Sequence, residues 1–387
     1  MTNKSSYPIP YHPTWDWMDS SKLKCYSTCE RMFFYKYVCG YDSRTKSRHL
    51  VIGDAWHKMM EIIGLTNTVE NFDDVLIALS KNQWTSVNIM EAAHQTCMEH
   101  PTLRRAVEAA FDICYTEIAD TTWAMYADTW APKIPGRLPL ALITYIMLNR
   151  EHDSAYEMVL STDGTPMMEV GCQFVFEGTS GITMLMKARW DKVVRNKITN
   201  TIMVREHKTS GNLNNFSQEW ELAIQPSTYA AAMRMFFPIG EQQDAIVEMD
   251  GLSFAKTKLD VKKDAVDPFR HNNAMRCQVR KAMKGFRIWY GEVDSRIEAL
   301  FRDYTLLHEA KETDPVLWAF PMRTNSCHNQ YGTPCPFVTY CQAYANPLEH
   351  IRSEQMLENF TIRFWNPDEQ KPPKVTLVND QSTPPMD

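Results

Sequence analysis

The side chains with the clearest capacity for chemistry are two carboxylates and one amine, those of Asp191, Glu206 and Lys208. Glu206 and Lys208 are two residues apart, so on a strand they share one face. Two carboxylates held close together repel each other, and a structural site gains little from them. A hard divalent cation reverses this balance, because the carboxylates become its ligands and the lysine acts on what the metal activates. Taken alone the pattern is weak, and an ordinary solvated salt bridge explains it more simply.

A β-hairpin is expected to bring these side chains together. Residues 189–194 and 203–210 are rich in β-branched and aromatic residues, and a turn-like polar stretch separates them. In such a hairpin Asp191 lies opposite Arg205 or Glu206, depending on the register. The two strands therefore place both carboxylates at one end of a sheet.

Length, composition and charge limit the class of protein. The 387 residues leave room for one elaborated domain or two, and a hydrophobic content of 44% is ordinary for a globular chain. There is no apolar run of membrane-spanning length and no apolar secretory signal at the start, so we expect a cytoplasmic protein with no membrane partner. The net charge of -6 excludes a protein that is basic all over. Residues 22–58 and 256–287 are locally basic, however, and could form a nucleic-acid footprint.

The N-terminal part of the chain reads as helical. Ser20 or Ser21 is expected to cap a first helix, which carries aromatic residues on one stripe and basic residues on another. A second helix is expected over residues 53–63, with Asp54 as its N-cap and His57 in its first turn.

Later segments change between helical and strand periodicity. The expected helices cover residues 72–79, 103–118, 138–148, 225–236 and 273–307, the last as one helix or two, and the expected strands cover residues 169–176 and 245–254. Pro226 suits the first position of its helix, which would make Gln225 the cap residue. From about residue 366 proline and charge dominate, which predicts a disordered tail.

Cysteines form a second group of candidate ligands. Cys327, Cys335 and Cys341 fall within one polar loop broken by glycine and proline, whereas burial alone would scatter them through helices and strands. A closed metal site needs a fourth ligand, and His328 would complete a zinc site of the Cys3His type. An N-terminal cysteine would instead join the two ends of the chain, and ordinary free thiols remain the simplest alternative.

Six motifs in order give the chain a family resemblance. They are the helix Ser21-Lys-Leu-(x)5-Cys29-Glu-Arg-Met-Phe-Phe-Tyr, Gly53-Asp-Ala-Trp-His57, Asp191, Glu206-His-Lys208, Gln225-(x)3-Tyr229, and the C-terminal cysteines. Together they resemble the RecB-like branch of the PD-(D/E)XK nuclease superfamily, in the form that carries an iron–sulfur cluster. That form includes AddB-type helicase–nucleases, CRISPR-associated adaptation nucleases and phage exonucleases. The resemblance covers residues 20 to about 344.

The resemblance implies a role for each matching position. Asp191 and Glu206 would hold Mg2+ or Mn2+, with His57 and the backbone carbonyl of His207 as further metal ligands. Lys208 would orient the attacking water or stabilise charge on the phosphate, while Gln225 and Tyr229 would position Lys208 or a DNA strand. A [4Fe–4S] cluster would be held by Cys29, Cys327, Cys335 and Cys341, with Cys25 as the alternative fourth ligand and zinc as the alternative metal. The candidate phosphate contacts are Lys22, Arg31 and Lys36.

The implied fold is an α/β restriction-endonuclease-like core, a mixed central sheet flanked by helices, with an inserted helical subdomain. The expected segments are an N-terminal arm (1–19), N-terminal helices (20–69), the helical insertion (70–165), the core with the cysteine cluster (166–345) and a partly disordered extension (346–387). The implied activity is metal-dependent hydrolysis of DNA, with an exonuclease favoured, in phage or bacterial recombination, repair or replication beside a helicase or recombinase. The alternative is a non-catalytic DNA-binding or assembly protein on the same scaffold.

Overall fold

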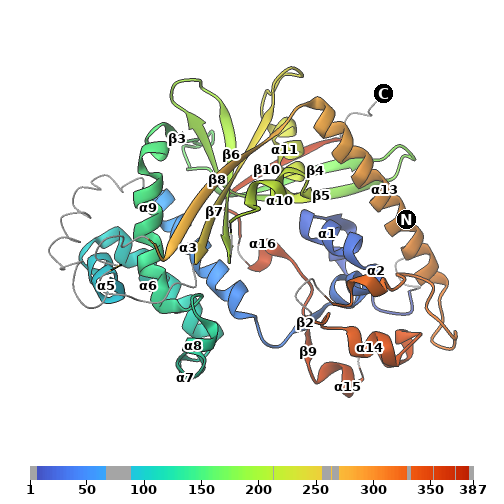
Figure 1. Cartoon of the computed structure of the whole chain (residues 1–387). Coiled ribbons are helices and arrows are strands. Elements are labelled where there is room, and N and C mark those ends of the chain that lie inside the picture. The colour runs from blue at the N-terminus through green and yellow to red at the C-terminus, as the bar shows by residue number, and fades with distance from the viewer. Residues whose placement is uncertain are drawn as a thin grey trace.

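The fold is a mixed sheet with helices on both faces (Figure 1). The computed structural model describes residues 7–66, 89–211, 213–254, 263, 270–328, 333–351, 353–370 and 372–382. The helices are α1 (Ser20–Thr28), α2 (Glu30–Phe33), α3 (Arg48–Thr66), α5 (Ile89–Glu99), α6 (Pro101–Glu117), α7 (Asp120–Met125), α8 (Ala127–Trp130), α9 (Leu138–Ser154), α10 (Phe216–Glu221), α11 (Ile224–Phe236), α13 (Met283–Glu309), α14 (Val338–Ala343), α15 (Glu354–Leu357) and α16 (Pro367–Gln370). Shorter helical turns are η1 (Pro13–Asp16), η2 (Phe34–Val38), η3 (Pro135–Arg137), η4 (Thr324–Ser326) and η5 (Pro347–His350).

In the described part of the chain, eight strands build the central sheet, in the order β10-β4-β5-β6-β7-β8, with two short strands paired to β5. They are β1 (Trp17–Met18), β3 (Tyr156–Met158), β4 (Met168–Glu177), β5 (Thr183–Asn196), β6 (Ile202–Ser210), β7 (Ala245–Phe254), β8 (Asn272–Lys281) and β10 (Val375–Ser382); β2 (Tyr41–Ser43) and β9 (Phe360–Ile362) form a small second sheet. The β4–β5, β5–β6 and β7–β8 pairs are antiparallel, while β6–β7 and β10–β4 are parallel. The expectation of a mixed central sheet flanked by helices is confirmed.

Among the described residues, the two largest apolar cores lie on opposite sides of the sheet. One joins α3, α5, α6 and α9 to the end of β7 through Leu252 and Phe254. The other joins the N-terminal aromatic helices, α11 and α13 to β4 and β5. Because both faces of β7 are covered, all ten of its residues are buried, as expected for a central strand.

The hairpin predicted at the centre of the chain is present as β5 and β6. Lys192 pairs with Arg205 and Val193 with Val204, which puts Asp191 beside Glu206 at the next step of the register. The strands expected over 169–176 and 245–254 and the helices expected over 103–118 and 138–148 are also confirmed, as β4, β7, α6 and α9. The helix expected over 72–79 lies outside the described residues.

Several local expectations are wrong. The first helix is capped by Asp19, whose side chain accepts the Lys22 N–H at 2.7 Å, and not by a serine. The second helix begins at Arg48, so Asp54 and His57 lie in its interior and not at its start. Likewise α11 begins at Ile224 after the cap residue Ala223, which places Gln225 inside the first turn.

Two larger corrections concern the C-terminal third. Residues 272–281 form β8 and not helix, because they pair along their whole length with β7; the long helix begins only at Met283. The expected disordered tail is wrong for residues 367–370, which form α16, and for residues 375–382, which form β10. The division of the chain into the five expected segments remains a prediction. In the structure, α5, α6 and α9 of the expected helical insertion share an apolar core with α3 and the end of β7. Among the described residues, no helix is both long and apolar enough to cross a membrane.

Candidate active site

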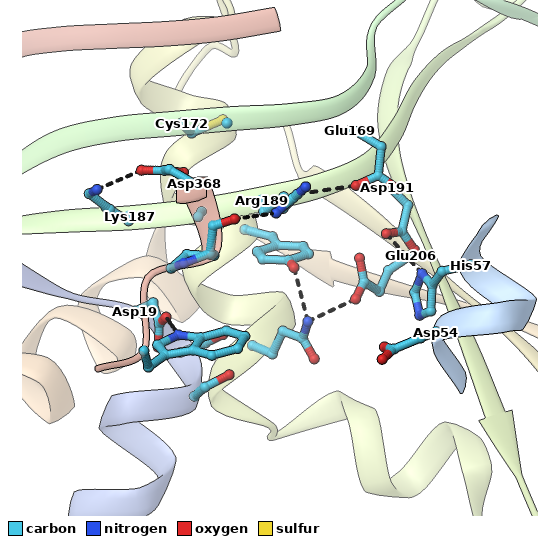
Figure 2. A pocket seen from close by; sticks show the side chains of 18 of the residues that line it. Asp19, Asp54, His57, Glu169, Cys172, Lys187, Arg189, Asp191, Glu206 and Asp368 are labelled. Carbon is cyan, nitrogen blue, oxygen red and sulfur yellow. Dashed lines mark hydrogen bonds and ion pairs between the residues drawn. The ribbon is translucent and has the colours of Figure 1, made fainter. Parts of the chain in front are cut away.

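The predicted carboxylates, Asp191 and Glu206, line the wall of a cleft of about 600 Å3 (Figure 2), and the predicted lysine contacts one of them. Lys208 Nζ lies 2.5 Å from Glu206 Oε1, and both residues come from β6. Asp191 from β5 accepts the backbone N–H of His207 through Oδ2 at 2.7 Å. His57 comes from α3, and its Nδ1 lies 3.2 Å from Asp191 Oδ1. Four of the predicted site residues thus surround one point, although their elements are far apart in sequence.

Gln225 and Tyr229 support this group from α11. Gln225 Nε2 donates to Glu206 Oε1 at 2.9 Å and to the Tyr229 hydroxyl oxygen, also at 2.9 Å. The two residues are one helical turn apart, so both reach the cleft from the same helix face. Gln225 thus contacts Glu206 directly, and the role that the resemblance implies for Gln225 and Tyr229, to position Lys208 or a DNA strand, stays a prediction.

Burial sets the protonation of the two carboxylates. Both Asp191 and Glu206 are buried, the latter only 3% exposed. Desolvation and the charge of Asp191 raise the pKa of Glu206 well above the ordinary range of a carboxyl group. Burial would raise the pKa of Asp191 as well, but His57, His207 and Lys208 overcome it and lower that pKa below its ordinary range. A cation between the two carboxylates would offset their mutual repulsion.

The donor set fits a divalent cation. Within the described part of the chain, no three His, Cys, Asp or Glu side chains already converge as a complete metal site. Glu206 Oε2, however, is buried with no hydrogen-bond partner in that same part of the chain, close to the charged Asp191. A buried carboxylate oxygen without a donor is costly, and a cation shared with Asp191 would satisfy both.

His207 contributes to the site through its backbone. Its imidazole is only 1% exposed and its Nδ1 lies 3.3 Å from Asp250 Oδ2, on the sheet face opposite Glu206. The ring is therefore unavailable to a ligand in the cleft. The role of its carbonyl as a metal ligand stays a prediction.

The cysteine group brings the N-terminal helices close to the loop that follows α13. Cys29 ends α1, and its sulfur accepts the backbone N–H of Arg323 at 3.5 Å, while Cys335 donates its N–H to the Cys327 carbonyl at 2.7 Å. Burial raises the pKa of the Cys341 thiol to about 12, and the neighbouring charges of Cys29, Cys335 and Cys327 act in the same direction. The four predicted cluster cysteines thus share one neighbourhood, but among the described residues no three of them stand as a formed metal site.

The alternative cluster ligands lie nearby. Cys25 is buried, and desolvation raises the pKa of its thiol to about 12, with Cys29 and Cys335 among its electrostatic neighbours. His328 forms an isolated β-bridge with Pro334 in the loop between Cys327 and Cys335. The choice between these ligands, and between iron–sulfur and zinc, stays a prediction.

Two of the three candidate phosphate contacts are corrected. Lys22 is 1% exposed, and its ammonium donates to the backbone oxygens of Thr14 and Trp17. Arg31 is buried and donates to the carbonyls of Phe320 and Leu317 at 2.8 and 3.0 Å. Both side chains hold the N-terminal helices in place and are not free to reach a phosphate. Lys36 is exposed and keeps its candidate role.

The cleft contains charged residues that the sequence reading missed. Lys187 and Arg189 precede Asp191 on β5 at two-residue intervals, and all three line the cleft with Glu169 and Asp368 (Figure 2). Strand alternation carried the signal for the two cations, because residues 187, 189 and 191 must share a face. Asp368 gave no such signal, since it lies in a segment expected to be disordered.

Comparison with known protein families identifies a match over most of the chain. The sequence model described as the PD-(D/E)XK nuclease superfamily matches residues 20–342, which is most of the chain and includes Asp191, Glu206, Lys208 and the candidate cluster cysteines. No curated protein matches the chain.

Proposed function

The chain belongs to the PD-(D/E)XK nuclease superfamily, and on that premise we propose that it is a metal-dependent deoxyribonuclease with Asp191, Glu206 and Lys208 as its catalytic residues. The observation that carries the proposal is the buried pair of carboxylates from β5 and β6, one with an oxygen lacking a partner, beside an ammonium in a cleft. A non-catalytic scaffold has no use for this arrangement, because it is electrostatically unfavourable until a cation joins it.

Each residue has a distinct role in this proposal. Asp191 and Glu206 would hold Mg2+ or Mn2+, with His57 and the His207 carbonyl as further ligands. When bound, the metal supplies Lewis acidity for a water molecule and for the phosphodiester. Lys208 extends its ammonium from the same strand as Glu206 and would orient the attacking water or stabilise charge on the phosphate. Gln225 holds Glu206 in place, and Tyr229 in turn accepts from Gln225.

Cleavage of end-labelled linear DNA tests the proposal. We expect degradation with Mg2+ or Mn2+ and none with EDTA, because Asp191 and Glu206 would hold the cation that activates the attacking water. Loss of the end label as mononucleotides would indicate an exonuclease, and internal fragments an endonuclease. A protein that binds several DNA forms but cuts none of them with either metal would instead be the non-catalytic scaffold.

The biological setting follows from the family resemblance. We place the activity in recombination, repair or replication of a bacterium or its phage, in the cytoplasm, with a helicase or recombinase as partner. What supports this placement is the order of the six motifs in residues 20–342.

The cysteine group is proposed to hold a [4Fe–4S] cluster that joins the two ends of the nuclease domain. The support is the shared neighbourhood of Cys29, Cys327, Cys335 and Cys341. We expect anaerobically purified protein to be brown, with iron and acid-labile sulfide that Cys335→Ser removes. Cys277→Ser, in a half-buried cysteine on β8, is the matched control and should keep both. Colourless protein with stoichiometric zinc would replace the iron–sulfur assignment with the zinc site.

A further inference from the structure

The C-terminal segment crosses the cleft as a strap, which we define as residues 365–370 and 372–382. The Trp365 indole donates to Asp19 Oδ2 at 3.0 Å, at the start of α1. Lys374 Nζ lies 2.7 Å from Glu61 Oε1 on α3. Between and beyond these anchors, α16 lies over the sheet and β10 pairs with β4 (Figure 1). The strap is therefore fixed to both sides of the cleft independently of its contacts with the cleft floor.

The floor beneath the strap carries two cations in line with the active site. Lys187, Arg189 and Asp191 alternate along β5 and line the same cleft. Residues two apart on a strand are separated by roughly 6.6 Å, a step comparable to that between consecutive phosphates of an extended nucleic acid strand. If one phosphate of a nucleic acid strand lies at Asp191, the next phosphates of that strand therefore lie above positive charge.

A carboxylate oxygen and a carbonyl oxygen of the strap bind these two cations. Lys187 Nζ lies 2.6 Å from Asp368 Oδ2, and Arg189 donates to the Pro367 carbonyl at 3.0 Å (Figure 2). The Arg189 Nε also lies 3.1 Å from Glu169 Oε2. An anionic oxygen on lysine and a second oxygen on arginine are the contacts that a phosphate group makes with such a pair.

The Lys187–Asp368 pair contributes little to holding the strap. The side chains of Lys187 and Asp368 are 15% and 33% exposed, and ion pairs in such partly hydrated positions are weak. Lys187 also has a second support, since its Nζ lies 4.8 Å from the centre of the Trp17 ring. The other amino groups on the described cleft wall, Lys46 and Lys58, are engaged by Glu117 and Glu61. Lys187 and Arg189 are thus the cations in line with the catalytic aspartate and held by the strap.

We propose that Lys187 and Arg189 form a binding subsite for a backbone phosphate of the nucleic acid, and that Asp368 occupies this subsite when no strand is bound. The inference rests on the proposed function for the identity of the ligand. Binding of a strand displaces the Asp368 carboxylate, and the strap stays anchored through Asp19, Glu61 and β4. Asp368 therefore lowers affinity for DNA by competing for Lys187.

Equilibrium DNA binding in EDTA tests this subsite apart from cleavage. Anisotropy of labelled single-stranded and duplex oligonucleotides, measured over a range of salt concentrations, gives the affinity and its salt dependence. We expect Asp368→Asn to tighten binding about three- to tenfold, and Lys187→Gln to weaken it and reduce the salt slope by about one. In a Lys187→Gln background, Asp368→Asn should give no gain, because its target is gone.

Matched controls separate the subsite from general charge. Glu369→Gln removes an exposed carboxylate next to Asp368, and Lys197→Gln removes an exposed ammonium at the far end of the same hairpin. Equal effects of Asp368→Asn and Glu369→Gln, or of Lys187→Gln and Lys197→Gln, would overturn the inference. So would a lower melting temperature of Asp368→Asn with unchanged DNA affinity, which would make the pair a structural contact.

The outcomes also separate this inference from the nuclease proposal. If the wild-type protein cuts DNA and the Lys187→Gln variant binds DNA as tightly as the wild type, the subsite is contradicted and the nuclease proposal is not. If both substitutions change DNA binding as expected but the wild-type protein never cuts DNA, the subsite is supported and the nuclease proposal is contradicted. Wild-type protein that neither binds nor cuts DNA contradicts both.

Discussion

Replacing Asp191 with asparagine is expected to lower the rate of metal-dependent DNA cleavage about a thousandfold or more, which corresponds to roughly 4 kcal/mol in the activation barrier. Asparagine keeps the shape of the side chain, and its carbonyl oxygen can still accept the His207 N–H that Asp191 accepts at 2.7 Å. What it removes is the charge, and with it an anionic ligand for the cation. The Asp191 charge also raises the pKa of Glu206, so the variant should ionise Glu206 at a lower pH without recovering cleavage.

A single-turnover cleavage assay with saturating enzyme measures this loss, and circular dichroism with DNA binding in EDTA shows that the variant is folded. Asp244→Asn is the matched control, because Asp244 is an exposed carboxylate immediately before β7 and should leave the rate unchanged. Cleavage by Asp191→Asn at the wild-type rate would show that the metal site lies elsewhere.

The parts of the site that the sequence predicts are those defined by local periodicity. Alternation along residues 189–194 and 203–210 gives the hairpin, and the hairpin alone brings Asp191 beside Glu206. The motif identifies His57 but predicts a helix that starts too late, because Gly53 and Asp54 resemble a helix start and here lie inside α3. The sequence thus identifies His57 as a site residue but misplaces it within its helix.

The features that the sequence does not predict depend on contacts between residues that are far apart in the chain. β8 contains Arg276, Gln278 and Arg280, a polar composition that reads as an exposed helix, and only its pairing with β7 makes it a strand. The strap is rich in proline and charge, yet β10 is ordered by the edge of β4. Lys22 and Arg31 read as surface cations, and only the fold shows that backbone carbonyls bind them inside the protein. No short window of sequence contains these partners.

A buried network of charges under the active site is the largest feature of this kind. Arg205 lies on β6 between Val204 and Glu206, and its side chain points to the opposite sheet face from Glu206. Its Nη1 lies 2.6 Å from Asp153 Oδ1 and its Nε 2.5 Å from Glu248 Oε1. Arg276 joins the same group through Asp153 and Asp250, and Asp250 in turn contacts His207. The strand that carries Glu206 and Lys208 is therefore held from behind by ion pairs.

Replacing Arg205 with methionine is expected to lower the free energy of unfolding by about 3–5 kcal/mol. Arg205 is 1% exposed and Glu248 is fully buried, so removal of the arginine leaves a carboxylate in the interior without its closest cation. Urea denaturation followed by circular dichroism measures the loss. Arg195→Met on the neighbouring strand is the control, because its side chain is 39% exposed and its Nη1 lies 3.9 Å from Glu157 Oε1, and an exposed pair of this kind contributes at most about 1 kcal/mol. Equal losses for the two arginines would mean that water reaches the network, and the buried charges would then not explain how β6 is held.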